Sequence, residues 1–176
     1  MVTGLVHLSR PADAALEALA DTLSALVSGV AAGLVADAVV IVPAPDPGVA
    51  TVVEATGATL VVAPAGTDPW RAGAAAARRD WVLCLAAGDV PAEGWIRAVD
   101  RFIAEEHDRS RGPVIGRMRR GDGWLARLSA WRLPTASWPH GARAGDVLRR
   151  EHLLAPRPAR TGVRRLTARI ERPSHP

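Results

Sequence analysis

Three short apolar runs, each continuous rather than alternating, constrain the fold of this chain more than any other feature. The runs are Ala38–Val42 (AVVIV), Thr59–Ala63 (TLVVA) and Trp81–Leu85 (WVLCL). A strand that is apolar at every position buries both of its faces, as strands do in a parallel sheet that is covered by helices on both sides. Each connection between the runs has room for a helix, and such connections are right-handed crossovers. The runs therefore predict a three-layer α/β domain with a doubly wound, mostly parallel sheet.

The segments around these runs carry helix signals. A first strand is predicted at Leu5–Ser9, and the leucines that follow it recur at three- and four-residue steps, which is typical of an amphipathic helix. Gly48–Thr56 is predicted as a helix that ends at Gly57, because glycine adopts the left-handed conformation at little cost. Asp68 and Pro69 predict the start of another helix, with the carboxylate as its cap and the proline in its first turn. That helix (WRAGAAAARR) has little bulk, so it can lie close to the sheet.

The second half of the chain has a different pattern. The expected elements are a helix at Pro91–Glu105, a strand at Val114–Arg120, a short helix at Trp124–Trp131, an irregular loop at Leu133–Ala144, either strand or helix at Asp146–Leu154, and a last strand at Val163–Glu171. We expect one domain over residues 1–176, with a nucleotide-binding half (1–108) and a basic, loop-rich half on the acceptor side (109–176).

The charges are distributed unevenly. All 22 basic residues are arginines, and from Arg109 onward there are 16 arginines and only four acids. Such a basic half favours a partner that bears phosphate, such as a nucleotide diphosphate or an anionic membrane surface. Nucleic acid is not expected, because no nucleic-acid-binding motif accompanies the charge. A solvated arginine-rich surface is the alternative interpretation.

Nothing in the sequence indicates export or a membrane span. The single cysteine, Cys84, fits a reducing compartment, and no basic segment opens the chain as in a signal peptide. The apolar region Ala25–Val42 is interrupted by Gly29, Gly33 and Asp37, so we interpret it as a helix end, a loop and a strand. We expect a cytoplasmic protein, and its basic half is the part that would contact a membrane surface peripherally.

The order of these features resembles the family 2 glycosyltransferases, and more narrowly a short bacterial subgroup of them. The matching segments are LVHLSRPADAALEALADTL, AVVIV, GATLVVAPAG, WRAGAAAARRDWVLCL and VPAEGW. The resemblance covers Leu5–Phe102 and is only positional beyond it. It implies a GT-A fold that binds a nucleotide-sugar at the carboxyl ends of its parallel strands, and it implies a divalent cation, Mg²⁺ or Mn²⁺, as cofactor.

The resemblance also implies three acidic positions, and the sequence departs from all three. The family has paired acids after the second strand, to contact the nucleoside, whereas this chain has only Asp46. The family's DxD motif, which holds the metal on the diphosphate, corresponds to Ala86-Ala87-Gly88-Asp89. The family's general base corresponds to APRPAR, which has no acid, so Asp146 and Glu151 are the remaining acids that could replace it. We therefore expect sugar transfer to be weak or lost.

Three residues are candidates for a site, each with a simpler alternative. Asp89 is predicted to bind the metal and the diphosphate, or else only to cap the following helix. Asp46 is predicted to contact the substrate, or else only to shape a turn. Arg71 is predicted to reach the diphosphate from a helix start, or else to be an ordinary exposed arginine. Two functions lead: a weakened glycosyltransferase, and a non-catalytic regulatory module that binds a nucleotide or a protein. A third, nucleic-acid binding through the arginine-rich half, rests on charge alone.

Overall fold

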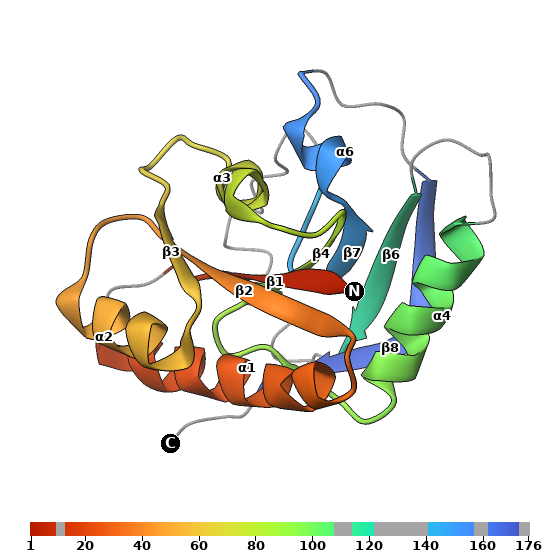
Figure 1. The fold of residues 1–176 in the computed structure, drawn as a ribbon, viewed down its shortest axis with the longest axis horizontal. Coiled ribbons are helices and arrows are strands. Elements are labelled where there is room, and N and C mark those ends of the chain that lie inside the picture. Colours follow the sequence, from red (N-terminus) through yellow and green to blue (C-terminus); the bar gives the residue numbers. More distant parts are fainter. Residues whose placement is uncertain (10–12, 108–113, 122–140, 157–161, 173–176) are drawn as a thin grey trace.

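The computed structural model of the protein describes residues 1–9, 13–107, 114–121, 141–156 and 162–172 (Figure 1). The predicted helix Trp124–Trp131 and most of the predicted loop Leu133–Ala144 lie outside the described residues.

The described residues form one eight-stranded sheet in the order β3-β2-β1-β4-β7-β6-β8-β5. The strands are β1 (Val2–His7), β2 (Val35–Val42), β3 (Thr59–Val62), β4 (Trp81–Ala86), β5 (Val90–Pro91), β6 (Val114–Arg120), β7 (Asp146–Arg149) and β8 (Gly162–Glu171). The helices are α1 (Asp13–Ala31), α2 (Pro47–Thr56), α3 (Pro69–Ala76), α4 (Trp95–His107) and α6 (Arg150–Leu154). The predicted α/β class is confirmed.

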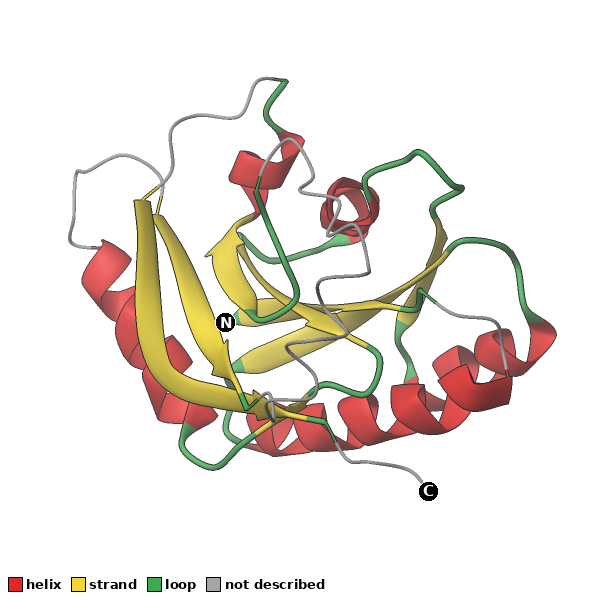
Figure 2. Cartoon of the chain, turned by 180° about the vertical axis from the view of Figure 1, so that it is seen from behind, coloured by secondary structure: helices red, strands yellow, loops and turns green. Residues whose placement is uncertain are grey.

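Most strand pairs in the sheet are parallel. β1 pairs in parallel with β2 and β4, β2 with β3, and β6 with β8. β7 is antiparallel to both β4 and β6, so β4 and β6 run in the same direction. The ends of β1, β2, β4, β6 and β8 therefore meet at one side of the sheet, which we call the carboxyl edge. The sheet is strongly curled, so that its β6–β8 part turns away from its β1–β3 part (Figure 2).

Helices cover both faces of the sheet, as the continuous apolar runs predicted. Helices α1, α2 and α4 lie on one face, and α3 and α6 lie on the other (Figure 1). Alternate residues of β4 feed two separate cores, with Leu83 and Leu85 in the core that contains Trp95, and Val82 and Cys84 in the core that contains Trp70. The expectation of burial on both faces is wrong for β3, because it is the edge strand.

Several predicted boundaries differ from the observed ones, such as that of the first strand, which runs over Val2–His7 rather than Leu5–Ser9, and two of the differences follow from strand pairing or from a direct junction between elements. Helix α4 begins at Trp95 rather than Pro91, because Val90 and Pro91 form β5, which pairs with the end of β8. β5 is an edge strand, where a proline, which has no N–H to donate, is tolerated. The sequence left the segment Asp146–Leu154 open between strand and helix. It contains both, because strand β7 runs directly into helix α6.

Helix α3 lies close to the sheet, as its small residues predicted. A Cβ atom at Gly73 would be 2.5 Å from Cδ1 of Ile41, which is a fully buried side chain. The carboxylate of Asp68 caps this helix by accepting hydrogen bonds from the backbone N–H groups of Trp70 and Arg71, as predicted. The first turn of α3 is thereby fixed at the carboxyl edge.

We predict that Gly73→Val destabilises the protein by about 1–3 kcal/mol more than Ala75→Val, because only the first inserts atoms into a packed interface. Ala75 is exposed on the same helix, so its variant carries the same β-branched side chain without the overlap. Urea unfolding of both variants measures the difference. Equal midpoints would show that α3 does not pack on β2 this closely.

Candidate functional site

The turn that follows β4 is held firmly at the carboxyl edge. The N–H of Ala87 donates to the carbonyl of His7 at the end of β1, over 3.0 Å. The N–H of Gly88 donates to the carbonyl of Ala18 and to Oγ1 of Thr22, each over 2.9 Å, so the turn is also fixed to α1. Gly88 has a φ of 88°, a conformation that a side chain would strain. These contacts fix the position of the next residue, Asp89.

The carboxylate of Asp89 is completely buried and accepts three hydrogen bonds. Its Oδ2 atom accepts from the backbone N–H of Ala86 and from Nη2 of Arg120, each over 2.9 Å. Its Oδ1 atom accepts from Nε of Arg172 over 2.8 Å. Asp89 thus forms ion pairs with two arginines, each from a different part of the chain.

Strand registers explain how these three residues meet. In the β5–β8 pair Val90 lies opposite Glu171, so the preceding Asp89 and the following Arg172 lie side by side. In the β6–β8 pair Arg120 lies opposite Ile170, which places it beside the same strand end. Sequence reasoning missed both arginines, because their positions depend on these two registers. The one available signal was that each follows or ends a predicted strand.

A second buried carboxylate, also in an ion pair, lies at the same edge. Asp146, which is also completely buried, accepts from Nε of Arg117 over 2.7 Å and from Nη2 over 2.8 Å, and it accepts from the backbone N–H of Arg143 over 2.9 Å. The hydrogen bond to Asp146 raises the pKa of the Arg117 guanidinium. We call Asp89, Arg117, Arg120, Asp146 and Arg172 the carboxyl-edge cluster. Its three guanidinium groups and two carboxylates give it one net positive charge.

The carboxyl-edge cluster does not, as arranged, fit a resident divalent cation. Both oxygens of Asp89 already accept hydrogen bonds from donors, and both arginines would repel a cation. Within the described residues, no group of three or more histidines, cysteines or acids is placed to hold a metal. Metal binding by Asp89 stays a prediction, and in this arrangement it requires an arginine to move away.

The alternative interpretation of Asp89 as a helix cap is wrong. Helix α4 begins six residues later, at Trp95, and the carboxylate accepts a hydrogen bond from Ala86, which precedes it in the chain. The carboxylate of Asp89 therefore stabilises the turn after β4 and pairs with the two arginines.

Asp46 and Arg71 also lie at or near the carboxyl edge but have other contacts. Oδ1 of Asp46 accepts from the N–H of Val49 over 2.9 Å and so caps α2. Arg71 is exposed in the first turn of α3, and its Nη1 donates to the carbonyl of Ala155 over 3.2 Å. No hydrogen bond or ion pair between described residues joins either one to the carboxyl-edge cluster. Their substrate contacts stay predictions.

A histidine at this edge was not singled out as a site residue from the sequence. His7 ends β1, and its ring meets that of Trp70 edge-on, with 5.7 Å between the ring centroids. Burial lowers the pKa of His7, while the charge of Asp68 acts in the opposite direction. Oδ2 of Asp68 is buried and has no hydrogen-bond partner among the described residues. This pair adds an imidazole and a buried carboxyl oxygen to the part of the edge at the end of β1.

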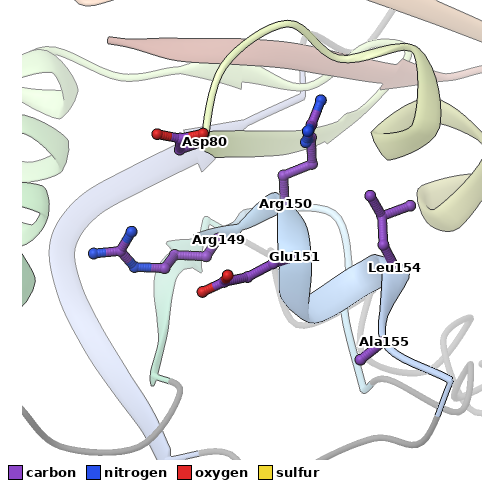
Figure 3. A pocket seen from close by; sticks show the side chains of 6 residues that line it. All are labelled: Asp80, Arg149, Arg150, Glu151, Leu154 and Ala155. Carbon is purple, nitrogen blue, oxygen red and sulfur yellow. The ribbon is translucent and has the colours of Figure 1, made fainter.

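Glu151 does not join the carboxyl edge. It lines a cavity of about 500 Å³ at the opposite edge, together with Asp80, Arg149 and Arg150. Figure 3 shows Arg149 and Glu151 pointing to the same side of the β7–α6 junction. Arg150 is engaged there, since its Nη1 donates to the carbonyl of Ala77 over 2.6 Å. Of the two acids that could replace a missing general base, one is therefore remote and the other, Asp146, is paired with Arg117.

Membrane contact was also expected as a possible use of the basic half. No helix among the described residues is both long enough and apolar enough to cross a membrane. The contact of the arginine-rich half with an anionic surface stays a prediction from charge.

Comparison with known proteins finds likeness only at the level of structure, since no family model and no curated protein matches the sequence. S. aureus TarS in complex with UDP aligns with a TM-score of 0.54 and 14% identity, over 87% of this chain and 48% of that chain. The chain thus spans about half the length of this TarS fragment, which comprises residues 1–349, and 29% of the longer TarS chain. A mycobacterial protein aligns with a TM-score of 0.57 and 16% identity, over 99% of this chain and 68% of that one.

A third solved structure is glucosyl-3-phosphoglycerate synthase from Mycobacterium tuberculosis, in complex with Mn²⁺, UDP and glucosyl-3-phosphoglycerate. It aligns with a TM-score of 0.51 and 15% identity, over 99% of this chain and 73% of that one. At such identities the likeness shows the fold, and it confirms the predicted GT-A type of sheet.

We predict that Asp89→Asn lowers the free energy of unfolding by about 1–3 kcal/mol, because it weakens two charge-assisted hydrogen bonds. The expected loss is smaller than for a fully buried ion pair, because both guanidinium groups are partly exposed and water hydrates them once the carboxylate is gone. Asp100→Asn, an exposed position on α4, is the matched control. Thermal and urea unfolding measure both variants, and an unchanged stability of Asp89→Asn would contradict the ion pairs.

Proposed function

We propose that this protein is a glycosyltransferase-like protein that binds a nucleoside diphosphate or a nucleotide-sugar at its carboxyl edge, and in which sugar transfer is weak or lost. The observation that carries this proposal is the state of Asp89. It is the one acid of the turn where the resembling family holds its metal, and both of its oxygens are occupied by arginines and a backbone N–H.

Nucleotide binding is supported by the fold and by the charge at the edge. Open α/β sheets bind their ligands outside the carboxyl ends of the parallel strands. TarS and the synthase, which share this fold, were solved with UDP. The net positive charge of the carboxyl-edge cluster suits a diphosphate. In this proposal Asp46 contacts the nucleoside, and Arg71 contacts the diphosphate from the first turn of α3.

Weak or lost transfer is supported by the acids that the chain lacks or uses otherwise. Transfer requires that the charge on the leaving diphosphate be neutralised and that a base remove the proton of the acceptor hydroxyl. Asp146 is held by a bidentate contact with Arg117, and Glu151 lies at the opposite edge. Neither is therefore available as a base in this arrangement.

The alternative is a non-catalytic regulatory module that binds a nucleotide or a protein partner through the same edge. The paired carboxylates favour it over an efficient enzyme, because ion pairs that join strand ends stabilise the edge without serving a reaction. The two proposals differ in whether any turnover remains.

We predict that at least one of UDP, GDP and dTDP, or one of their sugars, raises the melting temperature. A ligand at a hundred times its Kd adds about 2.7 kcal/mol to the free energy of unfolding, which corresponds to several degrees. We expect release of UDP from UDP-glucose to stay close to the buffer background, because neither Asp146 nor Glu151 is available as a base.

Turnover well above the background would contradict the weakened chemistry and leave the binding proposal intact. Stabilisation by none of the nucleotides would contradict nucleotide binding and favour the module with a protein partner. Gly57→Ala, which lies far from the cluster at the end of α2, serves as a destabilised control for the melting assay.

A further inference from the structure

We infer that the guanidinium groups of Arg120 and Arg172 take the place of a divalent cation, so that the diphosphate of a nucleotide binds at the carboxyl edge without metal. This inference rests on the proposed function, since it assumes a nucleoside diphosphate as the ligand. It follows from the donors that the two arginines do not use toward the described residues, from the gradient of exposure in the cluster, and from the rigidity of its backbone.

In their contacts with the described residues, both arginines use only some of their N–H donors. A guanidinium group carries five N–H bonds. Arg172 uses Nε for Asp89, and Arg120 uses Nη2 for Asp89 and, over 3.4 Å, for the carbonyl of Ala144. No acceptor among the described residues takes a hydrogen bond from Nη1 or Nη2 of Arg172, or from Nε or Nη1 of Arg120. These are the groups that a phosphate oxygen would use.

The carboxylate of Asp89 and the guanidinium groups that pair with it differ in solvent exposure. The side chain of Asp89 is completely buried, whereas that of Arg120 is 31% exposed and that of Arg172 is 53% exposed. Seen from solvent, the negative charge lies behind the positive ones. An anion that approaches the edge therefore meets guanidinium groups first, and a cation is repelled before it reaches the carboxylate.

Asp89 acts as a positioning residue in this arrangement. The backbone fixes it through Gly88 and Ala86, and the strand registers fix the starting points of both arginines. A planar guanidinium that is held by one carboxylate presents its free edge in a defined direction, which suits bidentate contact with phosphate. Less side-chain entropy is then lost when the phosphate binds.

A metal at Asp89 and a diphosphate on the arginines predict opposite effects of one variant on binding. If Asp89 holds a metal, Asp89→Asn removes the ligand and diphosphate binding falls. If the arginines bind the diphosphate, Asp89→Asn removes a negative charge from behind them while its amide oxygen still accepts a hydrogen bond from a guanidinium group, so binding is kept or becomes tighter. This difference in sign does not depend on any catalytic activity.

The test is calorimetric titration of the protein (residues 1–176) with UDP and with inorganic pyrophosphate, each in EDTA and each in Mn²⁺. We expect UDP to bind in EDTA with a Kd within about twofold of that in Mn²⁺, and to bind more weakly as salt increases. Arg172→Ala should weaken UDP binding about tenfold or more, which is the effect of losing one charge-assisted contact. Asp89→Asn should keep or improve binding.

Arg97→Ala is the matched control, because it removes one positive charge from an exposed position on α4 and should leave the Kd unchanged. Arg172→Ala leaves Arg120 paired with Asp89, and circular dichroism and melting curves verify that each variant is folded. Binding that requires Mn²⁺ and is lost in Asp89→Asn would overturn this inference and leave nucleotide binding intact. Absence of binding by UDP and pyrophosphate in both buffers would overturn this inference and the proposed nucleotide binding together.

Discussion

The ion pairs of Asp89 with Arg120 and Arg172 are the contact on which the architecture of the carboxyl edge depends. A carboxylate without solvent exposure is tolerated only when it is paired and hydrogen-bonded, and here two guanidinium groups and one backbone N–H meet this need. The contact joins the turn after β4 to the ends of β6 and β8, and so it ties the first part of the chain to the second (Figure 1). The curl of the sheet makes this closure possible.

This contact also decides what chemistry the edge supports. A turn that presents free carboxylates to solvent binds cations, and a turn whose carboxylate is covered by arginines presents positive charge instead. The fold is that of glycosyltransferases that were solved with UDP, yet the charge at the turn has the opposite sign from that of a metal-binding motif. Retained fold and altered charge together lead to our proposal of a nucleotide-binding protein with weak or absent transfer.

The sequence predicted the wound part of the fold well, because local patterns determine it. The apolar run Trp81–Leu85 and the Asp68 cap both lie where they were expected. The sequence could not predict the partners of Asp89, since they are 31 and 83 residues away and meet it through strand registers. The start of α4 was also predicted wrongly, because Val90 and Pro91 pair with β8 instead. No local pattern in the sequence predicts this tertiary contact.

The most direct test of this account is whether a divalent cation reaches Asp89. The backbone amide of Ala86 donates to Oδ2 of Asp89 over 2.9 Å, so its NMR signal reports on a paramagnetic ion at that carboxylate. Mn²⁺ is added to the protein without a nucleotide, which would itself carry the ion to this edge, while the amide signals are recorded. Our account predicts that the signals of Ala86 and Asp89 stay as sharp as those of remote amides. Selective broadening of these two signals at equimolar Mn²⁺ would contradict it.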